Sequence, residues 1–99
     1  MQAWDLTRTL RTMTSERFVL RRANADFAAL DLHYGATGRC DGTLTVFDGS
    51  NLDERQIAEL LREIDERLLP DFSMEERNLA FTVVFGRVMG TFQAERDPS

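Results

Sequence analysis

Lysine is absent from this sequence, and cysteine, histidine and proline are scarce. All 12 basic side chains are arginines, and there are only one cysteine, one histidine and two prolines. A single cysteine excludes an intramolecular disulfide, so a hydrophobic core must hold the fold together. The longest apolar run, 79–86, is far shorter than the roughly 20 residues of a membrane-spanning helix. With no secretory signal pattern at the N-terminus either, we expect a cytoplasmic protein without a membrane span.

The remaining composition is that of a folded protein. Of the 99 residues, 42% are apolar and 29% are charged, which places the chain well away from disordered sequences. This length suits one hydrophobic core. We predict a single domain over 1–94 and a disordered tail over 95–99.

Charge is unevenly distributed along this acidic chain, whose net charge is −5. Residues 1–22 carry five arginines against two acids, whereas residues 48–76 carry ten acids against three arginines. The basic segment could contact nucleic acid, but the acidic segment would repel phosphate. We therefore do not expect nucleic-acid binding, and the arginines could equally pair with the acidic segment of a second subunit.

A helix is predicted over 52–68. Its apolar residues recur at helical spacing, while the opposite face is charged; the apolar positions are Leu52, Ile57, Leu60, Leu61, Ile64 and Leu68. Asn51 and Glu54 have the spacing of a capping box, and Pro70 would end the helix.

Three strands are predicted before this helix, at "RFVLRR" (17–22), "DFAALDLHY" (26–34) and "GTLTVFD" (42–48). Each alternates apolar and polar residues, and the segments between them contain Gly, Asn and Asp, which favour turns. We expect a register in which Leu32 faces Leu44 and Leu30 faces Val46. The glycines of 35–42 then form a hairpin turn and not a phosphate-binding loop, because a strand follows them.

The first fifteen residues are ambiguous. Ala3, Leu6, Leu10 and Met13 form a helical stripe, but four threonines between 7 and 14 favour a strand. We expect a helix here.

The segment "NLAFTVVFGRVMGTFQ" (78–93) contains one charged residue, Arg87. Leu79 to Phe85 are apolar or small on both alternating faces, which is typical of a strand buried on both sides. Gly86 and Gly90 could bend it, so 79–92 could be one kinked strand or two. A crossover through the 52–68 helix should return this strand parallel to the first and third strands of the meander.

The predicted fold class is therefore α+β, a two-layer sandwich with the order helix, three-strand meander, helix, strand (αβββαβ). Both helices would cover one face of a mainly antiparallel sheet. This order and the acidity resemble those of type III secretion chaperones. The resemblance, which rests on element order alone, implies a small acidic dimer that binds another protein. The order also loosely resembles that of double-stranded-RNA-binding domains, but the basic residues of their second helix are absent.

Few residues offer chemistry. His33 and Asp31 lie on one face of a strand, so the carboxylate could orient the ring as a general base requires, yet no nucleophile accompanies them. Cys40 falls in the predicted hairpin loop, where the neighbouring Arg39 could lower its pKa. No paired ligands at metal-binding spacing occur, so we expect neither a metal nor a cofactor.

Apolar side chains also remain for the sheet face opposite the helices. These are Val19, Phe27, Ala29, Phe47 and Val84. Such a patch is seldom left in contact with water, so we expect a homodimer through this face or through an edge strand. The favoured function is a non-catalytic protein-interaction module. The alternative is a small-molecule-binding protein or minor enzyme with a pocket at the dimer interface, near His33 and Asp31.

Overall fold

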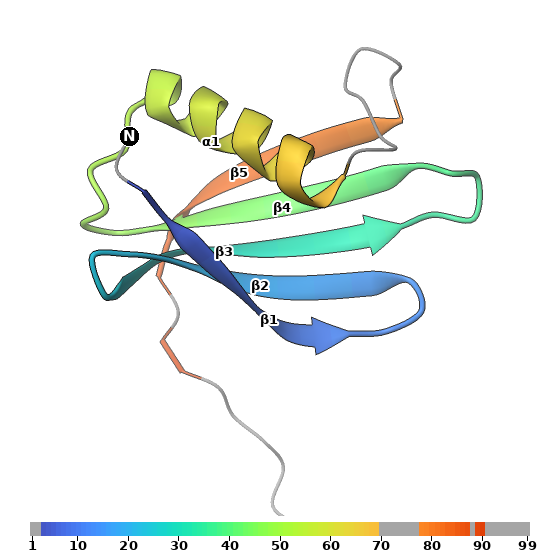
Figure 1. Cartoon of the computed structure of the whole chain (residues 1–99), viewed down its shortest axis with the longest axis horizontal. Helices are drawn as coiled ribbons and strands as arrows, with labels where there is room; N and C mark the ends of the chain where they lie inside the picture. The colour runs from blue at the N-terminus through green and yellow to red at the C-terminus, as the bar shows by residue number, and fades with distance from the viewer. Residues whose placement is uncertain (1–2, 70–77, 88, 91–99) are drawn as a thin grey trace, which may run out of the picture.

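The described residues form a five-stranded mixed sheet with one helix packed against it (Figure 1). A computed structural model describes residues 3–69, 78–87 and 89–90. Its elements are β1 (Asp5–Arg11), β2 (Ser15–Arg22), β3 (Ala25–Tyr34), β4 (Cys40–Phe47), α1 (Glu54–Leu68) and β5 (Leu79–Gly86). The strands lie in sequence order across the sheet; β1 to β4 are antiparallel neighbours, and β5 runs parallel to β4.

The predicted αβββαβ sandwich is wrong at its first element. Residues 5–11 form a strand, β1, which pairs with β2 and leaves α1 as the single helix among the described residues. The helical stripe misled because its members do not share a buried face: Leu10 is 47% exposed, and Met13, between β1 and β2, is fully exposed. Leu6 faces Leu20 in the covered layer, whereas Leu10 lies opposite Arg17 on the other face. The element order of type III secretion chaperones, which begins with a helix, is therefore not the order of this chain.

A threonine side chain organises the turn that joins β1 to β2. The Thr12 hydroxyl accepts hydrogen bonds from the N–H groups of Thr14 and Ser15, and the Thr12 N–H donates to the Ser15 carbonyl. Side-chain to backbone bonds of this kind stabilise turns and compete with helix formation. Threonine thus favours the hairpin twice, as a β-branched strand residue and as a turn residue.

The hairpin of β3 and β4 forms as predicted, but its register differs by two residues. Leu30 faces Leu44, and Leu32 faces Gly42. A shift of two positions keeps each side chain on its predicted face, because strand side chains alternate with period two. It also moves Cys40 out of the loop and into the first position of β4.

The helix is confirmed within two residues, but its cap differs from the prediction. Asp53 is the N-cap; its side chain accepts from the Gln56 N–H, and the Gln56 side chain accepts from the Asp53 N–H. Asn51 lies at φ 58°, in the left-handed region that Asn tolerates in turns, so it belongs to the connection before the helix.

The core lies between α1 and one face of the sheet. Ile57, Leu60 and Ile64 of the helix pack against buried side chains of the strands. The main strand contributions are Phe18, Leu20, Ala28, Leu30, Leu32, Cys40, Leu44, Val46 and Leu79. We call this the covered face.

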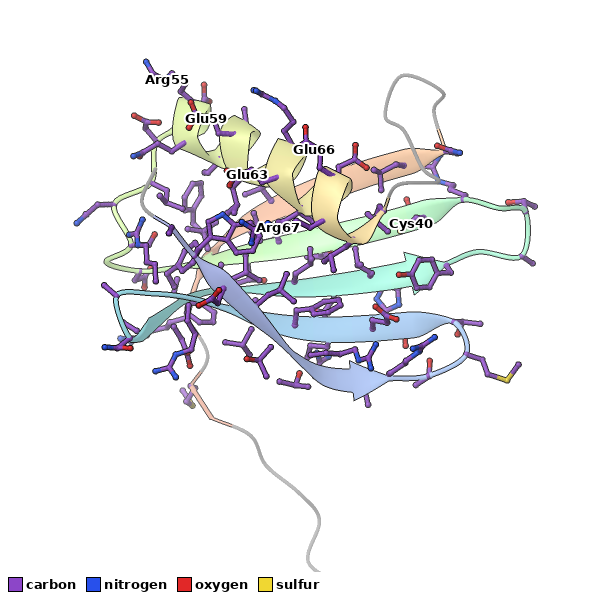
Figure 2. All side chains as sticks on the ribbon, in the orientation of Figure 1. Cys40, Arg55, Glu59, Glu63, Glu66 and Arg67 are labelled. Carbon is purple, nitrogen blue, oxygen red and sulfur yellow. The ribbon has the colours of Figure 1, made fainter. Side chains whose placement is uncertain are left out.

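Trp4, just before β1, closes one side of this core. It is buried, its indole N–H donates to a Glu63 carboxylate oxygen at 2.6 Å, and the Arg67 guanidinium lies 4.0 Å from its ring centre. Arg67 also donates to the Trp4 carbonyl. In Figure 2, Arg67 lies on the side of α1 that faces the strands, whereas Arg55 and Glu59 project away. Helix and N-terminal segment are thereby joined.

β5 has the predicted direction but not the predicted burial. It runs parallel to β4, as the crossover requires, yet it is an edge strand on which Val84 and Phe85 are 43% and 62% exposed. The strand ends at Gly86. Pro70, predicted to end the helix, and the predicted tail over 95–99 lie outside the described residues.

Candidate interaction face

The sheet has a second face, on the side opposite α1, which we call the open face. Its apolar centre is a row of directly paired residues from four strands. Val19 of β2 faces Ala29 of β3, which faces Thr45 of β4, which faces Val84 of β5. Among these, Val19, Ala29 and Thr45 are half-buried and Val84 is exposed. The row is continuous because each strand keeps the same alternation across the sheet.

A second row beside it is polar. Arg17 faces Asp31, and Asp31 faces Thr43, which is paired in turn with Thr82. The Arg17 Nε donates to the Asp31 carboxylate at 2.6 Å. Since both side chains are partly exposed, water and salt screen this ion pair, and it contributes little to stability.

Between the rows and the edge of β1 the open face is hollowed. The hollow has a volume of about 540 Å³ and is lined by Thr9, Leu10, Arg17, Val19, Ala29, Asp31, Thr45 and Phe47. Its floor is apolar, and its single ion pair lies on one side. Pockets that hold small molecules have comparable volumes but enclose them more fully.

The predicted interface residues occupy different surroundings. Val19, Ala29 and Phe47 line the hollow, and Val84 lies at the end of the apolar row. Phe27 is instead buried, with 4% of its surface exposed, at a register shift between β2 and β3. The Arg22 guanidinium lies 4.9 Å from the centre of its ring. An interface role for these five residues stays a prediction.

The structure does not join His33 to Asp31. Both residues project from the open side of β3, but Asp31 accepts from Arg17. His33 is exposed, lies outside the hollow, and has Ser15 and Asp41 as its cross-strand neighbours. A general base needs a partner that orients it and a substrate position within hydrogen-bond reach. His33 and Asp31 therefore stay weak candidates for catalysis.

Cys40 is not the reactive loop cysteine that its neighbour Arg39 suggested. It is fully buried on the covered face, and Arg39 pairs with Asp41. Burial, with smaller contributions from the charges of Asp41 and Glu16, raises the pKa of the thiol to about 11. The reactive form of cysteine is the thiolate, so this thiol is inert at neutral pH while the chain is folded.

The basic segment of residues 1–22 is largely neutralised within the sheet. Arg8 and Arg11 lie near the Glu16 carboxylate, and Arg21 pairs with Asp26 at 2.9 Å. With Arg17 bound to Asp31, each of these four arginines has an acidic neighbour. Sequence reasoning missed these pairs because they depend on the register of β1, β2 and β3.

The described residues contain neither a cluster of metal ligands nor a membrane-spanning helix. Within 3–69, 78–87 and 89–90, no group of three or more metal-binding side chains occurs. No helix in these ranges is long and apolar enough to cross a bilayer.

Comparisons with known proteins add no identification. No family model matches the chain, and no curated protein or solved structure is significantly similar to it. Its function must therefore be argued from the two sheet faces and the strand edges.

Proposed function

We propose that this protein is a non-catalytic, cytoplasmic interaction module that forms a homodimer through the open face. The observation that carries the proposal is the apolar row of Val19, Ala29, Thr45 and Val84, together with the hollow beside it. No described residue covers this row, because α1 packs against the opposite face. A second layer on the open face would complete a sandwich of two sheets.

Charge supports a second copy as the occupant. The centre of the open face carries Arg17 and Asp31 side by side and is neutral, although the chain has a net charge of −5. In a two-fold dimer, Arg17 of each copy can meet Asp31 of the other. The acidic helices would lie on the outer surfaces of the dimer, far from each other, so their repulsion would be small.

The test is the oligomeric state, measured by sedimentation velocity and native mass spectrometry from micromolar to near-millimolar concentration. Ala29→Arg places a charge in the middle of the row and should give a monomer with an unchanged circular dichroism spectrum. Ala58→Arg, on the exposed side of α1, is the matched control and should remain dimeric. A wild-type monomer at the highest concentration, or a dimer of Ala29→Arg, would contradict the proposal.

A second candidate function is small-molecule binding in the hollow. The observation in its favour is the apolar floor with the Arg17–Asp31 pair at one side, an arrangement that could orient a polar group. A bound small molecule would appear as added mass in native spectra and would disappear on denaturation. Asp31→Asn should reduce its occupancy, and His33→Ala, outside the hollow, should not.

A further inference from the structure

The outer edge of β5 is a different surface from the open face. β5 is the last strand of the sheet, and no described residue pairs with its outer side. All eight of its residues, Leu79 to Gly86, are uncharged. Phe85, which faces Val46 across the ladder, points to the α1 side of the sheet and is 62% exposed.

The hydrogen bonds to β4 show which groups of this edge are unused. The Cys40 N–H donates to the Asn78 carbonyl at one end of the ladder, and the Asp48 N–H donates to the Gly86 carbonyl at the other. In a parallel pair, alternate residues direct both backbone groups to the same neighbour. The even-numbered residues of β5 therefore face β4. The N–H and C=O groups of Leu79, Phe81, Val83 and Phe85 point outward.

The opposite edge of the sheet is protected, which makes the edge of β5 distinctive. β1 carries Asp5, Arg8 and Arg11 and contains a register shift. Charges and irregularities of this kind prevent an edge strand from pairing with other chains. β5 has no charge within its bounds, and its register with β4 is regular over the whole length.

The charge of α1 indicates which kind of strand could pair with the outer edge of β5: a second copy of this chain or a segment with basic side chains. The helix contains five acids and three arginines. Glu63 and Arg67 contact Trp4, on the side towards β1. Asp65 lies about 200° around the helix from each of them, so it is on the side towards β5.

Acidic groups on this side lack local partners. Glu54 and Asp65 have no ion-pair partner among the residues that the structure describes, and one oxygen of Asp65 is buried without a hydrogen bond. A second copy joined edge to edge would bring two such helices together on one side of the sheet. A segment with basic side chains on that side would be attracted to the helix.

We infer that the outer edge of β5 accepts an extended segment of a partner protein as an added strand, with basic side chains on the α1 side and apolar side chains on the open side. The main-chain groups of Leu79, Phe81, Val83 and Phe85 would hold the segment, as in other cases of strand addition. The exposed Phe85 ring would contact its cationic side chains. The inference does not depend on the homodimer.

The first experiment measures amide hydrogen exchange in the unbound protein by NMR. The N–H groups of Thr82 and Val84 face β4 and should exchange slowly, whereas those of Phe81, Val83 and Phe85 should exchange at least tenfold faster. Equal protection of the two sets would overturn the inference, because the outer edge would then be occupied already.

The second experiment titrates two labelled decapeptides and follows fluorescence anisotropy. One peptide alternates valine with lysine, and the other alternates valine with glutamate. The basic peptide should bind at least tenfold more tightly, and its binding should slow the exchange of the Phe81, Val83 and Phe85 amides. Equal affinities, or binding without that protection, would overturn the inference.

A pair of substitutions at one position isolates backbone recognition. Phe85→Ala removes the ring but keeps the outward N–H, whereas Phe85→Pro removes both and leaves the bonds to β4 intact. Phe85→Ala should lower the affinity for the basic peptide. Phe85→Pro should lower this affinity at least tenfold further. Unchanged binding by Phe85→Pro, in a sample whose circular dichroism matches wild type, would mean that the peptide only adheres to the acidic surface. The monomeric Ala29→Arg variant should bind normally, which separates this result from the fate of the homodimer.

Discussion

The covered and open faces of the sheet are built from the same strands, and β4 shows how much the burial of side chains differs between them. Cys40, Leu44 and Val46 point to α1 and are fully buried, whereas side chains at alternate positions, such as Thr45 and Phe47, are only half-buried. The covered face packs against the apolar stripe of α1. The open face carries smaller and more polar side chains and has no described second layer.

This difference separates stability from function. Apolar burial supplies most of the favourable free energy of folding, so the covered face must carry most of the stability. The open face can then vary in sequence at a small cost in stability, and it can be used for binding. The comparison implies that equal substitutions on the two faces should have unequal effects.

The largest expected effect comes from neighbouring residues of β4. Leu44→Ala removes a fully buried side chain and should lower the free energy of unfolding by about 2–5 kcal/mol. Thr45→Ala, one position on and on the open face, should lower it by less than about 1 kcal/mol. Urea unfolding followed by the fluorescence of Trp4, the only tryptophan, measures both at one protein concentration. Similar losses at the two positions would mean that the open face is also a packed core.

Two glycines provide a second pair. A Cβ at Gly42 would lie 2.6 Å from a ring carbon of Phe81 on the covered face, whereas a Cβ at Gly86 on the open face would have no neighbour within 4 Å. Gly42→Ala should therefore lower the free energy of unfolding by about 1–3 kcal/mol, because the Phe81 ring must move. Gly86→Ala should change the free energy of unfolding little.

Replacing Phe81 tests the cause of that cost. In the double variant Gly42→Ala with Phe81→Leu, the smaller side chain leaves room for the new methyl group. The loss should then be smaller than the sum of the two single losses, measured by urea unfolding. Additive losses would show that the contact with Phe81 does not limit the size of residue 42.

Trp4 sharpens the comparison at the border of the covered face. Trp4→Phe keeps an aromatic ring but loses the hydrogen bond to Glu63, and we expect a loss of about 1–2 kcal/mol in unfolding free energy. Circular dichroism must report it, since the variant has no tryptophan. Glu63→Gln retains an acceptor, so its free energy of unfolding should fall by less than that of Trp4→Phe. An equal loss in both variants would assign the stabilisation to the charge of Glu63.

Much of the fold could be predicted from the sequence because its patterns are strongly periodic. Alternation identified β2, β3 and β4, the apolar stretch Leu79 to Phe85 identified β5, and the apolar stripe identified α1 within two residues. β1 could not be predicted from periodicity, because a register shift after Arg8 places Leu6 and Leu10 on opposite faces, so the strand has no regular apolar alternation. The register of β3 and β4 also depended on turn geometry that the glycines alone did not specify.

Less of the candidate site could be predicted. Alternation places Val19 and Ala29 opposite the apolar core positions of their own strands, so their common location followed from the sequence. The Arg17–Asp31 pair did not follow, because it requires the pairing of β2 with β3. Nor did the burial of Phe27, which depends on a shift near the turn between these strands. Contacts between strands are set by tertiary structure and leave no local pattern.

The smallest predicted effect concerns Asp65, which has an unpaired oxygen within the covered layer. Burial, and then the charge of Glu66, raises the pKa of the Asp65 carboxyl above its ordinary value. The folded state therefore binds this proton more tightly than the unfolded state does, so the contribution of Asp65 to stability is greatest below the ordinary carboxyl pKa and declines as pH rises through the raised pKa. Asp65→Asn should consequently increase the free energy of unfolding at pH 7 by at most about 1 kcal/mol, and this gain should vanish in acid. Glu66→Gln removes the same charge from the last turns of the helix without relieving a buried oxygen, so it should gain less. Urea unfolding at pH 7 and near pH 3 measures both variants, and an equal gain for the two would attribute the effect to the helix dipole and not to burial.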